Sequence, residues 1–113
     1  MVTQTEFYNF ALDLPESDQG SHFDVTDFRV KGRIFATLRE SDGRAVLKLS
    51  PDQQQLLMTT TPGMFEPVKG GWGAKGWTHV LLSQADEATV RHGLRMAWKS
   101  VAPKKLAGLA GSA

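Results

Sequence analysis

The sequence contains no cysteine, and this absence excludes several kinds of chemistry. Without thiols the chain cannot form a disulfide, a thiolate zinc site, an iron–sulfur cluster or a cysteine nucleophile. No apolar run approaches the roughly 18 residues of a membrane-spanning helix, and the start lacks the basic and apolar regions of a signal peptide. We therefore expect a cytoplasmic protein that is held together by packing alone and does not contact a membrane.

Positive charge is missing from the start of the chain. Residues 1–27 contain six acidic residues and no lysine or arginine, whereas all 13 Lys and Arg fall in the rest of the chain. The net charge of +1 therefore hides an acidic segment and a basic remainder. A basic surface attracts phosphates and other anions, although the two segments could also neutralise each other after folding.

Local signals predict three helices within a single compact domain. The 113 residues suit one domain, which we place at residues 1–106, with residues 107–113 as a flexible C-terminal tail. Thr3 and Ser50 are each followed three residues later by Glu or Gln, the pattern of a capping box at a helix start. The three helices run from Thr3 to Pro15, from Ser50 to about Thr60, and from Ser83 or Asp86 to Pro103.

Alternating apolar and polar residues predict the strands. Residues 33–39 alternate, which places Ile34 on one face of the strand and Phe35 on the other. Residues 16–20 are polar and predict a turn. The resulting order of helix, three strands, helix, two strands, helix indicates an α+β fold, a two-layer α/β arrangement with an antiparallel sheet and helices on one side. The other candidate strands are 21–24, 28–30, 45–49, a short segment near 65–68 within a loop at 61–77, and 77–82.

Four short motifs occur in order along the chain. They read FRVKGRIFA at 28–36, VLKLSP at 46–51, WG at 72–73 with GWT at 76–78, and AW at 97–98 with VAPK at 101–104. Together they resemble the MmcQ/YjbR-like family of small bacterial proteins. The resemblance implies an α-β3-α-β2-α fold similar to that of type III secretion chaperones. It also implies a double-wing shape, for which the family is labelled DNA-binding by fold analogy.

A row of basic residues on the last predicted helix is the first candidate site. Arg91, Arg95 and Lys99 recur every four residues and therefore line one helix face. Their mutual repulsion is only about a few tenths of a kcal/mol per pair. A solvated surface therefore explains the row as well as a phosphate backbone does. The predicted wing hairpins add four further candidate phosphate contacts, which are Arg33, Arg39, Arg44 and Lys48.

The loop rich in glycine and tryptophan is the second candidate site. Residues 71–76 match G-x-G-x-x-G, but a predicted strand follows them instead of the helix that a dinucleotide site requires. We therefore expect glycines that serve a turn. Trp72 is flanked by glycines and is the candidate for exposure and for stacking on a base or another ring. Burial in a small core is the alternative explanation for the aromatic residues of this loop.

Catalytic motifs are not evident in the sequence. The three histidines lie on different predicted elements, and none belongs to a zinc-protease or serine-hydrolase motif. His22 and Asp24 would share one strand face, but two ligands do not make a metal site. We therefore expect no enzymatic activity, no cofactor and no metal.

These observations favour a protein that binds duplex DNA weakly through phosphates. The seven basic residues named above would be the contacts, with Trp72 as a stacking residue. One alternative is a protein-interaction or homodimerisation module whose sheet exposes an apolar face around Phe35, Val46 and Leu81. Another is binding of a small ligand under the Gly/Trp-rich loop.

Overall fold

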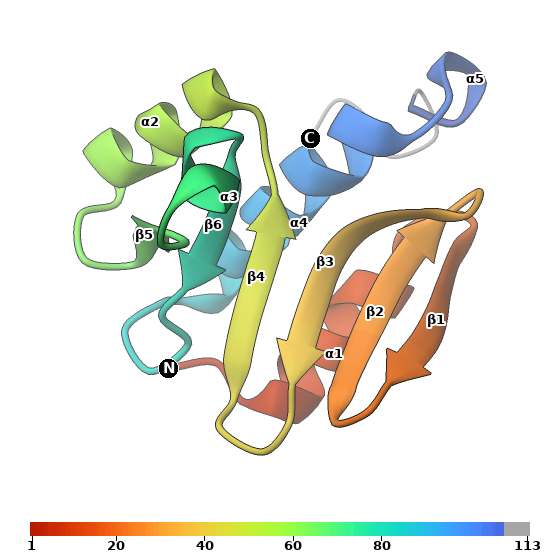
Figure 1. The fold of residues 1–113 in the computed structure, drawn as a ribbon, viewed down its shortest axis with the longest axis horizontal. Helices are drawn as coiled ribbons and strands as arrows, with labels where there is room; N and C mark the ends of the chain where they lie inside the picture. The colour runs from red at the N-terminus through yellow and green to blue at the C-terminus, as the bar shows by residue number, and fades with distance from the viewer. Residues whose placement is uncertain (108–113) are drawn as a thin grey trace.

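The computed structural model describes residues 1–107, which form one antiparallel sheet with the helices Gln4–Leu12 and Glu87–Val101 packed on one face (Figure 1). The predicted tail lies, from residue 108 onward, outside the described residues. The strand order across the sheet is β1-β2-β3-β4-β6-β5. The strands are β1 (Ser17–His22), β2 (Val25–Val30), β3 (Arg33–Arg39), β4 (Arg44–Lys48), β5 (Phe65–Pro67) and β6 (Trp77–Val80). The helices are α1 (Gln4–Leu12), α2 (Pro51–Thr60), α3 (Gly71–Ala74), α4 (Glu87–Val101) and α5 (Lys104–Ala107).

The predicted helix starts are confirmed by their hydrogen bonds. Thr3 and Ser50 each accept a bond from the backbone N–H three residues later, and the Glu6 and Gln53 side chains complete the two capping boxes. Asp86, rather than Ser83, caps α4 and accepts a bond of 2.7 Å from the Thr89 N–H. No helix within residues 1–107 is both long and apolar enough to cross a membrane.

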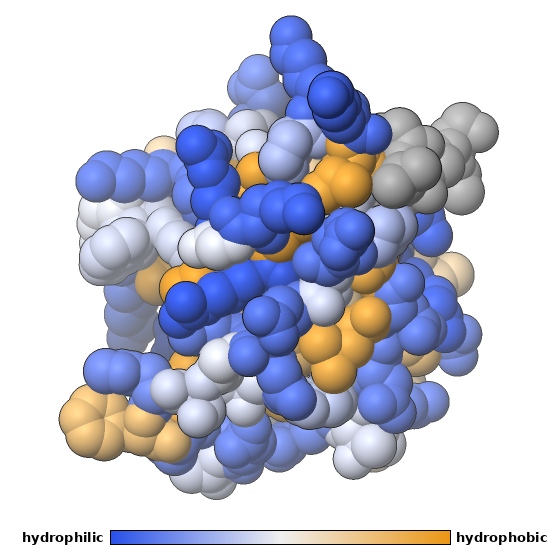
Figure 2. Space-filling model, turned by 90° about the vertical axis from the view of Figure 1, so that its right-hand side faces the viewer, coloured by the Kyte–Doolittle hydropathy of each residue, from blue (hydrophilic) through white to orange (hydrophobic). Residues whose placement is uncertain are grey.

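The predicted α+β class and two-layer antiparallel architecture are confirmed, and the structure adds three elements to the predicted order: a fourth strand before α2, and the short helices α3 and α5. β1 begins at Ser17, where the sequence predicts a turn from residue 16 to residue 20. This strand pairs with β2 along its whole length but is polar, because it lies at the sheet edge. Figure 2 shows this side of the molecule covered mostly by hydrophilic side chains. The short helix α3 occupies part of the predicted loop between β5 and β6.

A bulge in β3 reverses the predicted orientation of Phe35. The register of β3 against β2 shifts, so that Ala36 pairs with Phe28 and Ile34 pairs with Arg29. Phe35 is left between these pairs and is completely buried, as is Ala36. The prediction that Phe35 belongs to an exposed apolar face is therefore wrong, because strict alternation fails where an extra residue enters a strand. Ile34 lies on the exposed face instead.

The hydrophobic core lies between the sheet and the helices α1 and α4, which are behind the sheet in Figure 1. Trp98 of α4 is fully buried, and its indole N–H donates a bond of 2.9 Å to the Pro15 carbonyl. Gly93 allows α4 to approach the sheet closely, since a Cβ there would lie 3.0 Å from Leu47 Cδ1. The opposite face of the sheet, over β3 and β4, is left open toward the viewer.

Candidate functional site

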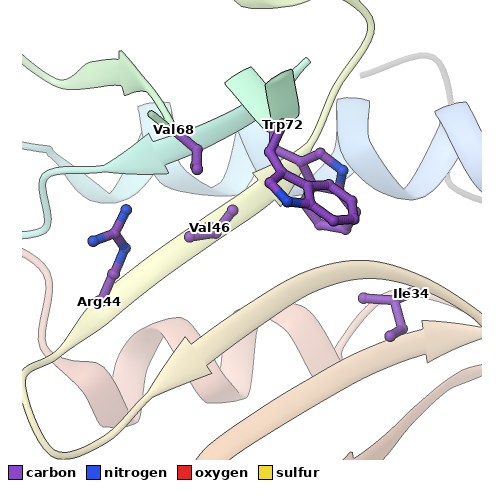
Figure 3. A pocket seen from close by; sticks show the side chains of 6 residues that line it. Ile34, Arg44, Val46, Val68 and Trp72 are labelled. Atoms are coloured by element: carbon purple, nitrogen blue, oxygen red, sulfur yellow. The ribbon is translucent and has the colours of Figure 1, made fainter. Parts of the chain in front are cut away.

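The open face of the sheet carries a shallow apolar pocket over β4 (Figure 3). Its volume is about 370 Å³. Val46 lies at its centre, with Arg44 toward one end and Trp72 toward the other. The complete lining consists of Ile34, Arg44, Val46, Val68, Trp72 and Trp77. The pocket thus joins an aliphatic floor, two indole rings and one guanidinium group.

Two glycines of the loop hold α3 against the sheet, and α3 carries Trp72. A Cβ at Gly73 would lie 1.9 Å from the Val68 carbonyl oxygen, and one at Gly76 would lie 1.9 Å from the Leu49 carbonyl oxygen. Gly76 also has a φ of +107°. The expectation that the G-x-G-x-x-G glycines serve a turn holds for Gly76, whereas Gly73 permits close packing of a helix.

The side-chain amide of Gln54, on α2, forms hydrogen bonds to the same loop. Its Nε2 donates to the carbonyl oxygens of Gly73 and Trp77 at 3.1 and 3.2 Å, and it lies 3.0 Å from the Thr78 hydroxyl. The loop is therefore ordered independently of Trp72, whose side chain remains 62% exposed. The Trp72 and Trp77 rings meet edge to face, with centroids 5.9 Å apart.

Lysine side chains border the two indole rings. The Lys48 ammonium lies 5.7 Å from the centre of the Trp77 ring, and that of Lys75 lies 5.8 Å from the centre of the Trp72 ring. Both distances suit a cation–π interaction. Lys48 Nζ also donates a bond of 3.3 Å to the Lys75 carbonyl oxygen. The aromatic end of the pocket is thus positively charged.

Two acidic side chains beside the pocket each contact a neighbouring side chain. Glu66 lies 3.2 Å from His79, and Asp42 accepts two bonds from Arg39, at 3.0 and 2.7 Å. The hydrogen bond from Arg39 holds the pKa of the Asp42 carboxyl below its ordinary value. Among the described residues, no carboxylate lies within 4.0 Å of the charged groups of Arg44 or Lys48. Arg44 and Lys48 therefore place positive charge beside the pocket without a carboxylate in direct contact.

The seven basic residues predicted as contacts lie on two sides of the sheet. Arg39 and Arg44 pair directly with each other on the open face, and Lys48 follows on β4. Arg33 pairs with the buried Val30, so its side chain leaves the sheet on the helix side. Arg91, Arg95 and Lys99 lie on α4, also on the helix side. The structure thus brings three of the seven together with Trp72.

Arg91 is already engaged within the helix layer. Its Nε donates to Glu87 at 3.1 Å, and its guanidinium lies 3.8 Å from Asp13 and 4.1 Å from the centre of the Phe10 ring. The partners Asp13 and Phe10 come from α1 and its end, so the sequence pattern of α4 alone could not reveal them. Within the described residues, no group of three His, Asp or Glu side chains is arranged to hold a metal ion.

Ile34, Val68 and Lys75 belong to the site although sequence reasoning did not select them. Ile34 reaches the open face only because of the bulge in β3. Val68 follows β5, where its N–H donates a bond of 3.0 Å to the Trp77 carbonyl oxygen and continues the pairing with β6. Only Lys75 carried a signal, since it lies between the two tryptophans in the sequence.

Comparison with known proteins identifies similar proteins without adding a described activity. A family model described as YjbR matches residues 12–100. Among solved structures, the chain is similar to the crystal structure of protein DR2400 from Deinococcus radiodurans, which has a DUF419 domain. The identity is 22% and the TM-score 0.76, over 98% of this chain and 89% of the other, which is a likeness of fold. No curated protein matches the chain.

Proposed function

The chain belongs to the YjbR family, and from this premise we propose that it is a non-enzymatic module that binds nucleic acid through the open face of its sheet. One observation carries the proposal. Within the described residues no carboxylate lies within 4.0 Å of the charged groups of Arg44 and Lys48, and both residues lie on the same face as the exposed Trp72. Cations beside an exposed aromatic ring are the groups that contact phosphates and bases.

The spacing along β4 suits a phosphate backbone. Arg44 and Lys48 are four residues apart on one strand face, a span of about 13 Å at the rise of a β-strand. This span corresponds to about four base steps of B-DNA. Arg39 and Arg44 face each other across β3 and β4, an arrangement that costs stability unless an anion is near. Asp42 supplies that anion directly to Arg39 and acts on Arg44 only from a longer range, so a phosphate could still pair with Arg44 directly.

Duplex DNA is the form of nucleic acid that the sequence favours, and the fold limits how it could dock. The basic row belongs to α4 on the helix side of the sheet, whereas Arg44 and Lys48 lie on the open face, so the two sets of cations lie on different sides of the sheet. We place the DNA on the open face, because Arg91 of the α4 row is already paired with acidic side chains.

Fluorescence anisotropy with a labelled duplex, titrated at low and at near-physiological salt, tests the proposal. We expect log affinity to fall linearly with log salt concentration. In the double variant R44A/K48A the slope becomes shallower by about 1.8, since each lost phosphate contact removes about 0.9. The matched variant R91A/R95A removes two charges from α4 and leaves the slope nearly unchanged. Absence of binding at low salt, or a larger effect in R91A/R95A, contradicts the proposal.

Self-association is a second candidate function, and it is supported by the apolar character of the same face. Ile34, Val46 and Trp72 are incompletely buried side by side around one pocket. Such a patch can be covered by a second copy of the chain. Sedimentation over a concentration series separates the two functions: a dimer that dissociates in Trp72→Ala supports self-association, and a monomer throughout contradicts it.

A further inference from the structure

We infer that the pocket on the open face receives one unpaired DNA base, so that the chain binds single-stranded DNA more tightly than a duplex of equal length. This inference rests on the proposed function and specifies which form of nucleic acid the same site prefers. It follows from the lining of the pocket, from the charges at its two ends and from the exposure of Trp72.

The size and lining of the pocket suit one planar ring. Its volume of about 370 Å³ is near the lower end of the range for ligand sites, which is about 300 to 1,000 Å³. Val46 and Val68 form an aliphatic floor, and Trp72 and Trp77 stand at one end. Indole rings stack well on any base, because every base has a flat π-face.

A base within a duplex cannot reach these rings. Its faces are covered by neighbouring base pairs, so a duplex would meet the open face through its phosphates only. Flipping a base out of the stack costs a few kcal/mol, a cost that a single strand does not have. An antiparallel sheet with helices behind it and aromatic residues on its open face is a general platform for stacking unpaired bases.

The positive charges at the two ends of the pocket favour a base that is part of a nucleic-acid strand, because such a strand carries phosphates on both sides of the base. Arg44 lies at one end of the pocket, and Lys48 and Lys75 border the tryptophans at the other end. A base between these ends would have phosphates of its own nucleic-acid strand toward cations in both directions. No carboxylate belongs to the lining.

The lining side chains also predict which bases are preferred. Arg44, Trp72 and Trp77 can donate hydrogen bonds through their N–H groups, and none of the lining side chains can accept one. Thymine and guanine present carbonyl acceptors at their edges, whereas cytosine presents an amino donor at the corresponding position. We therefore expect an oligo(dT) strand to bind more tightly than an oligo(dC) strand.

The experiment compares three labelled probes of equal length with the intact chain. They are an oligo(dT) strand, the same strand without its bases, and a duplex. The strand without bases retains every phosphate and lacks only the rings that would stack. We expect the oligo(dT) strand to bind about 5- to 150-fold more tightly than the strand without bases, the range expected for one stacked base.

Variants of Trp72 provide the second arm of the test. Trp72→Leu retains apolar bulk without an aromatic ring, and Trp72→Phe retains a ring. We expect Trp72→Leu to lose the preference for oligo(dT) and Trp72→Phe to keep most of it. We also expect oligo(dT) to quench the tryptophan fluorescence of the unmodified chain, and to do so much less in Trp72→Leu. The comparison of probes uses the unmodified chain, so it holds even if a variant folds poorly.

The outcomes distinguish the inference from the proposed function. If all three probes bind equally, R44A/K48A weakens each of them and Trp72→Leu changes nothing, phosphate binding stands and the base pocket is wrong. If the duplex binds more tightly than oligo(dT), the base pocket is also wrong. If no probe binds at low salt, the proposed function and the inference both fail. Tighter binding of oligo(dC) than of oligo(dT) overturns the hydrogen-bonding argument for the lining.

Discussion

Replacing Gly73 with alanine is the sharpest test of how the loop positions Trp72. The added Cβ would lie 1.9 Å from the Val68 carbonyl oxygen and 3.2 Å from Pro67 Cβ. Real Cβ atoms almost never approach another heavy atom within 3.0 Å, so α3 must move away from the β5 end. The obstructing atom is backbone, and no side-chain rotation can relieve the contact.

Gly71 in the same helix provides a matched control, because a Cβ there meets nothing within 4 Å. Overpacking of this kind costs about 1 to 3 kcal/mol, and we expect Gly73→Ala to lower the free energy of unfolding by an amount in this range. Gly71→Ala instead raises it by about 0.4 to 1 kcal/mol, because alanine restricts the unfolded chain.

Denaturant titration followed by circular dichroism measures both free energies of unfolding. Tryptophan fluorescence of the folded state then reports whether Trp72 has moved relative to Trp77, since their ring centroids are 5.9 Å apart. We expect the emission to change in Gly73→Ala and to stay as in the unmodified chain in Gly71→Ala. Equal stability of the two variants would refute the reasoning, because it would mean that α3 does not rest against the Val68 carbonyl.

Two further predictions concern the bulge and the charged turn. Phe35→Ala lowers the free energy of unfolding by about 3 to 5 kcal/mol, as expected for a fully buried ring. Ile34→Ala lowers the free energy of unfolding by less than Phe35→Ala does. A larger loss in Ile34→Ala than in Phe35→Ala, measured by denaturant titration, would contradict the bulge. The lowered pKa of Asp42 means that its pairing with Arg39 stabilises the fold above the ordinary Asp pKa, and that this contribution is lost as the pH falls through the lowered value. We therefore expect the melting temperature of Asp42→Asn to fall less on acidification than that of the unmodified chain, and an identical fall in both would contradict it.

Helix boundaries could be predicted from the sequence because they depend on neighbours three residues apart. The capping boxes at Thr3 and Ser50 form entirely within such local segments. The bulge at Phe35 could not be predicted, because it depends on how β3 pairs with β2. β1 was predicted only at its end, by the candidate strand 21–24, for a related reason: an edge strand with polar side chains lacks the alternation that marks a half-buried strand.

In the candidate site, too, features that depend on neighbouring residues could be predicted from the sequence, and features that depend on tertiary contacts could not. Exposure of Trp72 followed from its flanking glycines, and the structure confirms it. The pairing of Arg91 with Asp13 depends on a contact between distant segments, and so does the placement of the α4 cations on the other side of the sheet from the open face of β4. The sequence therefore identifies the basic residues, but it does not show which of them lie on the open face and which lie on the helix side of the sheet.

Because Trp72 is exposed, its contribution to binding can be tested separately from the contribution of the loop glycines to folding. Gly73 and Gly76 must remain glycine because backbone atoms occupy the space of their missing Cβ, and Gln54 fastens the loop without using the Trp72 side chain. An indole that is 62% exposed buries little apolar surface, so its removal changes stability only slightly. Trp72→Leu should therefore unfold at nearly the same denaturant concentration as the unmodified chain while it loses binding to oligo(dT). A large loss of stability in Trp72→Leu would instead assign the ring to the fold and remove the main reason for placing a base beside it.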